Sequence, residues 1–213
     1  MVDVAPIRAS SLDDWTRAIA RPTISPAGGS AAALTATAAA ALVEMVAALT
    51  ASRERYALVH EEAKAARALA EGLRQELLTL ASADAEALQR FSQALALPRE
   101  SDAERELRER QKRSALREGA EIQRDVLGGC AELAALGVAM AERGLESARA
   151  DAATAVFLAA GAARSAALAI RVNLEGEPAG SEPGGMVAAA AAKLAAVEEC
   201  ERLVGRLFDR RPD

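Results

Sequence analysis

Aromatic side chains are scarce in this sequence, which has one tryptophan, one tyrosine and three phenylalanines among 213 residues. They are scattered along the chain as Trp15, Tyr56, Phe91, Phe157 and Phe208. This spacing does not predict an aromatic platform on which nucleic-acid bases would stack. The formal net charge of -5 also provides no basic surface for a phosphate backbone. We therefore expect no nucleic-acid partner.

Cysteine and histidine are scarce too. Cys130 and Cys200 both lie in helix-like sequence without a Cys-x-x-Cys spacing, which argues against a metal site and against a disulfide scaffold. Free thiols in a reducing compartment are the expectation. The single histidine, His60, lies in a charged stretch and is predicted at the surface. A Ser-His-Asp triad or a multi-histidine metal site would each depend on that one residue.

The N-terminus lacks an apolar signal core. Residues 31–50 and 152–174 are apolar and long enough to cross a bilayer, but Glu44 and Arg164 lie inside them. Alanine, which dominates both runs, contributes little to membrane insertion. We therefore expect buried helices of a soluble, cytoplasmic protein with no membrane partner.

Alanine accounts for much of the 51% of hydrophobic residues, and this composition favours helices that pack closely through small side chains. No alternating strand pattern occurs, and no linker is long enough to divide the chain. The prediction is an all-α protein, a multi-helix bundle of long alanine-rich helices, with residues 1–213 forming a single domain.

Helical periodicity and turn residues place the individual helices. They are expected at residues 10–20, 30–51, 53–80, 82–97, 115–143, 147–171 and 186–208. Residues 99–120 carry dense charge of both signs and predict either a solvated helix or a mobile excursion. Gly144 is a plausible C-terminal cap, and residues 173–185 form a loop.

The stretch SPAGGSAAAL, residues 25–34, places two glycines directly before an alanine helix. Pro26 would fix the entry to a tight turn, and Gly28 and Gly29 would let another group approach the backbone. The free N–H groups of a helix start suit an anion. The alternative is that Ser30 simply caps the helix. Residues 182–194 repeat the proline, glycine-pair and alanine scheme, which common helix-start chemistry explains.

Residues 26–50, PAGGSAAALTATAAAALVEMVAALT, resemble the start of the cyclodeaminase domain of the formiminotransferase-cyclodeaminase family. That domain begins with a Pro-Gly-Gly-Gly-Ser turn and an alanine-rich helix that ends in Met-Val and Leu-Thr. Residues 80–98 resemble its aspartate-containing helix, with Asp84 at the acidic position. Residues 148–174 resemble a third segment, in which Asp151 and Asn173 match. The sequence departs from the family pattern at Ala27, Ala48, Gln123, Leu145, Ala150 and Ala153.

The resemblance implies a homodimer with sites near the subunit boundary, a tetrahydrofolate derivative as substrate, and no metal or other cofactor. The implied reaction is hydrolysis of 5,10-methenyltetrahydrofolate to 10-formyltetrahydrofolate. This reaction is favoured because a stand-alone chain has no formiminotransferase domain to hand over a formimino group. The alternatives are a formiminotetrahydrofolate cyclodeaminase, a divergent member that binds folate or another ligand without this catalysis, and a purely structural helical homodimer.

Two aspartates are the candidate catalytic residues. Asp151 is the preferred acid/base and is expected near a helix start and partly buried, where burial raises and the helix N-terminus lowers its pKa. Asp84 is the second candidate. Each is alternatively a helix N-cap, with Ser82 an equal cap candidate beside Asp84. A polar pocket that converges on Ser30, Asp84 and Asp151 would distinguish a ligand-binding protein from a structural one.

The remaining candidates are binding residues. The resemblance favours Pro26, Gly28, Gly29 and Ser30 as ligand contacts, with backbone N–H groups facing a folate carboxylate or carbonyl. Glu44, Tyr56, Arg171 and Asn173 complete the predicted substrate-binding set. Glu44 would either pair with an arginine or line the site. Tyr56 and the neighbouring Arg53 would either contact the substrate or pack at the surface.

Overall fold

The structure, a computed structural model, describes residues 10–178 and 180–209. Across these residues it contains helices and no β-strand. The helices are α1 (Leu12–Ile19), α2 (Gly28–Ala51), η2 (Glu54–Val59), α3 (His60–Leu95), α4 (Asp102–Arg143), η3 (Glu146–Ala148), α5 (Arg149–Asn173) and α6 (Glu182–Asp209). The predicted all-α bundle is confirmed. The expectation about an N-terminal signal core concerns mainly residues 1–9, which lie outside the described part.

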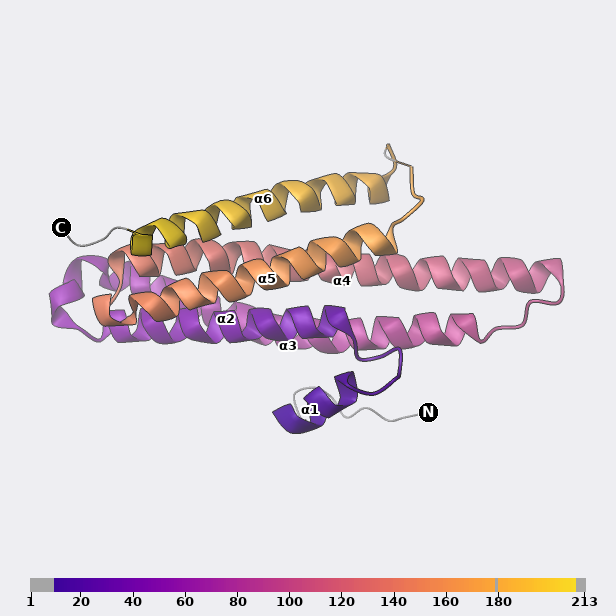
Figure 1. Ribbon diagram of the computed structural model, residues 1–213, viewed down its shortest axis with the longest axis horizontal. Coiled ribbons are helices and arrows are strands. Elements are labelled where there is room, and N and C mark those ends of the chain that lie inside the picture. The colour runs from indigo at the N-terminus through magenta and orange to yellow at the C-terminus, as the bar shows by residue number, and fades with distance from the viewer. Residues whose placement is uncertain (1–9, 179, 210–213) are drawn as a thin grey trace.

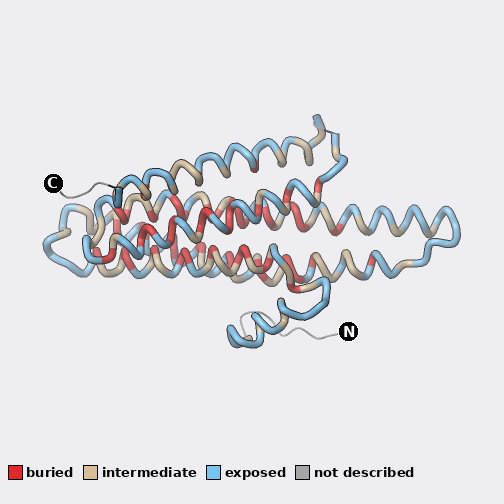
Figure 2. Tube along the Cα trace, in the orientation of Figure 1, coloured by how far each residue is buried: buried red, intermediate tan, exposed pale blue. Residues whose placement is uncertain are grey.

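The long helices lie nearly parallel or antiparallel in one elongated bundle (Figure 1). α2 packs against α3 and α5, and α4 packs against α3 and α5. α6 covers α4 and α5 on one side, and the short α1 lies beside the bundle at the other side (Figure 1). The core therefore lies among α2, α3, α4 and α5, where the buried residues concentrate (Figure 2).

The core is built mainly from alanine. α2 buries Ala33, Ala36 and Ala40, and α5 buries further alanines at helical spacing. Small side chains let helix backbones approach closely, and Gly137 shows how closely. A Cβ added there would lie 2.6 Å from the Val156 side chain and 3.3 Å from the Ala152 carbonyl oxygen. α4 and α5 therefore lie this close together because Gly137 has no side chain between them.

Two helices are longer than the sequence predicted. α3 runs through Ser82 without a break, and the Ser82 hydroxyl donates to the Leu78 carbonyl one turn earlier, so Ser82 caps nothing. The charged stretch at 99–120 is the first half of α4, which begins with a capping box between Ser101 and Glu104. The solvated-helix prediction was right and the mobile excursion was wrong. Residues 54–59, expected in a helix from 53, form the short 3-10 segment η2.

α3 and α4 extend well past the start of α2 and the end of α5 (Figure 1). We call this extension, residues 86–118, the arm. Only Ala87, Ala94 and Ala115 are buried within it, and Figure 2 shows it mostly exposed. The bundle thus changes from a multi-helix core to a two-helix hairpin at the level of the Gly28 end of α2.

α6 begins at Glu182, four residues before its expected start at 186, so the loop expected at 173–185 is shorter than predicted. The other boundaries agree with the predictions within two residues, and Gly144 is the C-cap of α4. α2 and the stretch Glu146–Asn173 are long and apolar enough to cross a membrane, a test that core helices of soluble proteins also pass. The most apolar window of each is 44% and 50% buried inside the chain. Each of these helices therefore has one face in the core and one apolar face outside it.

Candidate functional site

A cluster of polar side chains lies inside the bundle at its junction with the arm. Asp84 on α3 is 9% exposed, Ser30 on α2 is fully buried, and Gln123 on α4 is 1% exposed. The Ser30 hydroxyl donates to Asp84 Oδ2 at 2.9 Å, and Gln123 Nε2 donates to Asp84 Oδ1 at 2.7 Å. Three helices that are distant in sequence therefore hold one carboxyl group between them.

Burial raises the pKa of the Asp84 carboxyl above its ordinary value. Hydrogen bonds from Gln123 and Ser30 oppose this shift, because they stabilise the charged form, but the loss of solvation is larger. Such a carboxyl exchanges a proton more readily near neutral pH than an exposed aspartate does. Its place in the middle of α3 also excludes the N-cap interpretation of Asp84.

The turn before α2 positions Ser30 against Asp84. Ala27 is the N-cap residue, so Ser30 lies within the first turn of the helix and its side chain is free to reach Asp84. The prediction that Ser30 caps α2 is therefore wrong. The preceding loop is tied to α3 beside the cluster, because the Ser25 hydroxyl donates to the Ala85 carbonyl at 2.8 Å. Pro26 is buried in this turn.

Gly29 makes room for the carboxyl group. A Cβ at this position would lie 2.2 Å from Asp84 Oδ1 and 2.5 Å from Gln123 Nε2. The neighbouring Gly28 is exposed, and a Cβ there would meet nothing within 4 Å. The second glycine is thus required by the close approach of a polar side chain, while the first is not.

This contrast gives a matched pair of variants. Gly29→Ala is expected to lower the free energy of unfolding by about 1–3 kcal/mol, because Asp84 or α2 must shift to admit the methyl group. Gly28→Ala is expected to leave stability within about 0.5 kcal/mol of wild type. Urea unfolding followed by circular dichroism measures both. Equal stability of the two variants would contradict the close approach at Gly29.

Asn173 lies near the same junction, at the end of α5. A Cβ on Gly119 would lie 2.9 Å from Asn173 Nδ2, so the side chain of Asn173 packs directly on the backbone of α4. Gly119 precedes Gln123 by one helical turn. The structure therefore brings Asn173 to the level of Ser30, Asp84 and Gln123, and its role in substrate binding stays a prediction.

Asp151 lies at the opposite end of the bundle. It is in the first turn of α5, whereas Asn173 ends that helix, which places the two about 33 Å apart along the axis. The Asp151 side chain is exposed, and the N-cap of the helix is Ala148. The expectations of partial burial and of capping are both wrong, and within one chain Asp151 does not converge with Ser30 and Asp84.

Tyr56 is also at that far end. Its hydroxyl accepts from the Glu146 backbone N–H at 3.0 Å and from Arg55 Nη2 at 2.7 Å, and these bonds lower the pKa of Tyr56. The nearby His60 is half-buried, and one ring nitrogen lies 2.8 Å from the Arg53 carbonyl oxygen. Tyr56 therefore ties η2 to the start of η3, at the end of the bundle opposite Asp84.

Two further predicted residues lie outside the cluster. Glu44 forms an ion pair with Arg74 at 2.8 Å between α2 and α3, which confirms the structural alternative for this carboxylate. Arg171 is exposed and lines a 240 Å³ cleft between α5 and α6 together with Arg164.

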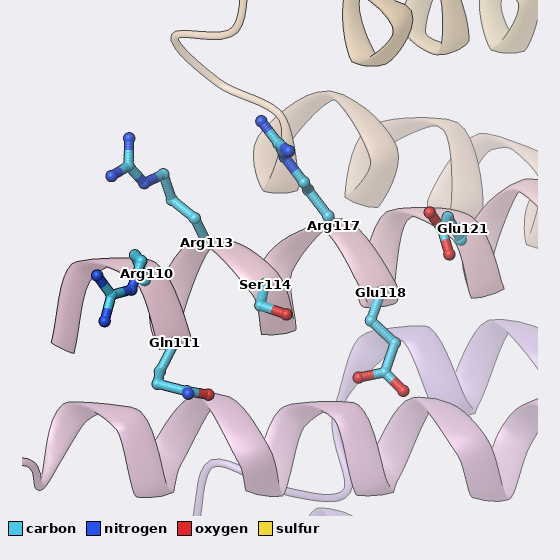
Figure 3. A pocket seen from close by; sticks show the side chains of 7 residues that line it. All are labelled: Arg110, Gln111, Arg113, Ser114, Arg117, Glu118 and Glu121. Carbon is cyan, nitrogen blue, oxygen red and sulfur yellow. The ribbon is translucent and has the colours of Figure 1, made fainter. Parts of the chain in front are cut away.

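A larger groove of about 750 Å³ runs along α4 where the arm joins the bundle (Figure 3). Its charged residues are Arg110, Arg113, Arg117, Glu118 and Glu121. Most of these charges are matched, since Arg110 pairs with Glu106, Arg117 with Glu177 and Glu118 with Arg90. The groove is therefore a solvated charged surface and not a strongly basic one.

Comparison with known proteins identifies the family. The family model described as formiminotransferase-cyclodeaminase matches residues 11–178. The chain belongs to the formiminotransferase-cyclodeaminase family. A methenyltetrahydrofolate cyclohydrolase from Methylorubrum extorquens is 32% identical over 166 residues, which is 78% of this chain and 80% of that protein. The solved structure of a formiminotetrahydrofolate cyclodeaminase from Thermotoga maritima has a TM-score of 0.84, at 24% identity, and covers 95% of this chain and 98% of that one.

The sequence predicts no site role for Gln123, which is only a departure from the family pattern, or for Gly119. A signal for Gln123 was present, because it falls within the apolar stripe of α4 that includes Ala120, Val126 and Leu127. A polar residue in such a stripe needs a buried partner. Among the described residues no group of three His, Cys, Asp or Glu side chains is arranged to hold a metal ion.

Proposed function

We propose that this member of the formiminotransferase-cyclodeaminase family is a methenyltetrahydrofolate cyclohydrolase with Asp84 as its acid/base. The observation that carries the proposal is the buried Asp84 carboxyl, held by Ser30 and Gln123 at 2.9 and 2.7 Å. The cyclohydrolase named above, 32% identical to this chain, supports the choice of reaction.

The chemistry needs one group that moves a proton. Water adds to the bridging carbon of the cationic amidinium, and N5 then leaves to give 10-formyltetrahydrofolate. The ionised Asp84 carboxyl would take one proton from the attacking water and give it to N5 as the bond between the bridging carbon and N5 breaks, while the second proton of that water is released to solvent as the formyl C=O forms. Its negative charge would also favour binding of the cation. The carboxyl accepts hydrogen bonds from Gln123 and from the side chain and backbone of Ser30, which hold it in place for proton transfer.

The surrounding groups supply contacts for the rest of the ligand. The backbone N–H groups of Gly28 and Gly29 begin α2 and suit a carboxylate or carbonyl oxygen, helped by the positive end of the helix. The Asn173 amide on Gly119 offers a donor and an acceptor nearby. Phe91 lies two turns beyond Asp84 on the same face of α3 and is half-buried, so it is available to stack on a pterin ring.

We also propose a soluble, cytoplasmic homodimer. The outer faces of α2 and α5 carry exposed apolar side chains, with Met45, Phe157, Leu168 and Val172 between 39% and 57% exposed. A second copy of the chain would cover this surface, which is too apolar to face water without cause. Burial raises the pKa of the Cys130 thiol to about 12, so this free thiol is unreactive and needs no oxidising compartment.

Hydrolysis of methenyltetrahydrofolate is the direct test of the activity. The loss of substrate absorbance in the ultraviolet should be faster with the protein than in buffer, after subtraction of the spontaneous reaction. Release of ammonia from formiminotetrahydrofolate, measured in parallel, tests the cyclodeaminase alternative, whose fold this chain shares. If neither substrate reacts faster than in buffer, the catalytic proposal fails. Calorimetry with tetrahydrofolate then separates a binding protein from a structural one.

A further inference from the structure

Gln123 has one half of its amide group occupied and the other half free. Nε2 donates to Asp84 Oδ1, while Oε1 is buried without a hydrogen-bond partner among the described residues. A buried amide oxygen without a partner destabilises the folded protein. Its neighbours along α4 in the same stripe are apolar, so packing alone would favour leucine or methionine at this position. Packing therefore does not explain why glutamine occupies position 123.

Within the part of the chain that the structure describes, no charged side chain contributes to the pKa shift of Asp84. α2 brings Ser30 and has no acidic residue in its first turn. On α3 the charged residues that follow Asp84 most closely in sequence are Glu86 and Arg90, which pair with each other, and Arg90 also pairs with Glu118 of α4 at 2.6 Å. The hydrogen bonds that act on the Asp84 carboxyl are those of Ser30 and Gln123. Gln123 is thus one of two groups that control this carboxyl.

We propose that Gln123 is a positioning residue that holds the Asp84 carboxyl in place in both of its protonation states by turning its amide group. When Asp84 is ionised, Nε2 donates to Oδ1, as observed. When Asp84 carries a proton, a half-turn of the amide lets Oε1 accept from the new O–H. The amide exchanges hydrogen bonds only, and the proton moves between water, Asp84 and N5. The inference rests on the proposed acid/base role of Asp84, because a turning amide is useful only beside a carboxyl that gains and loses a proton. The observed hydrogen bond between Gln123 and Asp84 does not depend on that role.

A wild-type measurement tests the coupling without any substitution. In protein labelled with 13C at aspartate carboxyl carbons and 15N at glutamine side chains, NMR spectra are recorded against pH. The Asp84 carbon, assigned by its loss in Asp84→Asn, and the Gln123 amide should titrate with the same midpoint. A Gln123 amide that does not change while Asp84 titrates would overturn the proposal.

A substitution tests the consequence. Gln123→Met keeps the length and most of the volume but removes the donor to ionised Asp84. The Asp84 midpoint and the acidic limb of the pH–rate profile are both expected to move to higher pH by about one unit. Gln111→Met, on the exposed face of the same helix, should move neither. If Gln123→Met lowers the rate and leaves both midpoints unchanged, Gln123 only packs and the proposal is wrong.

The two readouts separate the two proposals. If the wild-type protein does not accelerate hydrolysis but the Asp84 midpoint still moves in Gln123→Met, the function fails and the positioning role stands. If hydrolysis is confirmed and the Asp84 midpoint does not move, the proposed function stands and the positioning role of Gln123 fails. Should Gln123→Met not fold, the wild-type titration of Asp84 and Gln123 alone decides.

Discussion

Asp84→Asn is expected to lower the rate of methenyltetrahydrofolate hydrolysis by about 10²–10⁴-fold without loss of stability at neutral pH. The asparagine has the same shape and cannot exchange a proton. Its oxygen still accepts from Ser30, and its Nδ2 donates to the otherwise unpartnered Oε1 of Gln123 once that amide turns. The cluster thus keeps its hydrogen bonds and loses the cost of a buried charge.

The dependence on pH follows from the raised pKa of Asp84 in the folded protein. A carboxyl whose folded pKa exceeds its unfolded value binds protons more strongly when folded. Its contribution to stability is fully present below the unfolded pKa and is lost as pH rises through the folded pKa. Wild type should therefore lose stability relative to Asp84→Asn as pH rises across this window, and the difference should vanish at lower pH.

Thermal unfolding from pH 3 to 8, together with the absorbance assay, measures both effects. Glu86→Gln is the matched control, because it removes an exposed carboxylate two residues away on α3. It should change neither the rate nor the pH dependence. An Asp84→Asn protein that keeps its activity would exclude Asp84 as the acid/base. One that is markedly less stable at neutral pH would show that the carboxylate stabilises the fold.

Asp151→Asn is expected to be as inactive as Asp84→Asn if two antiparallel copies bring the ends of their bundles together. Within one chain Asp151 lies about 33 Å along the α5 axis from Asn173, which is at the level of Asp84, so a shared site requires Asp151 from one copy and Asp84 from the other. A mixture of the two inactive variants should then regain about a quarter of the wild-type activity. Random exchange in a two-fold symmetric dimer makes half the dimers mixed, and each of these has one complete site of two.

The experiment uses the two variants purified separately, mixed in equal amounts and allowed to exchange subunits. Light scattering should first report a dimer for each. Asp151 is exposed in the single chain, so Asp151→Asn should fold normally. Full activity of Asp151→Asn alone would remove this residue from the chemistry. No recovery in a mixture shown by mass spectrometry to contain mixed dimers would exclude a site shared between subunits.

The sequence was sufficient for the bundle, because alanine-rich periodicity and the family resemblance point to it directly. The resemblance also selected Asp84, but only as the second candidate after Asp151, and its catalytic role stays a prediction. The sequence predicted a break at residue 81 within α3 and left residues 99–120 of α4 open between a helix and a mobile excursion. Ser82 has the residue type of a cap, but inside a helix its hydroxyl bonds to the Leu78 carbonyl and the helix continues. Local sequence does not decide between these two uses of serine, whereas packing against α2 and α4 does.

The burial of Asp84 and the exposure of Asp151 could not be predicted from local sequence either. Asp84 is buried because α2 begins directly opposite it. Asp151 is exposed although its neighbours Ala152 and Ala153 are buried, so its side chain lies on the outer side of α5. Both environments depend on which side of the helix other helices cover. The partners of Asp84 come from positions 54 residues earlier and 39 residues later in the chain. A spacing rule within one helix does not reach that far.

The alanine core has a consequence for how the protein tolerates change. Ser30, Asp84 and Gln123 meet because α2, α3 and α4 lie at distances that alanine side chains allow. A methyl group has no rotamers, so an added methylene in this core has no side-chain rearrangement to absorb it and must push two backbones apart. Hydrogen bonds of 2.7–2.9 Å lengthen with that movement. The geometry of the carboxyl cluster therefore depends on core positions along the whole length of these helices, including positions that do not contact the cluster.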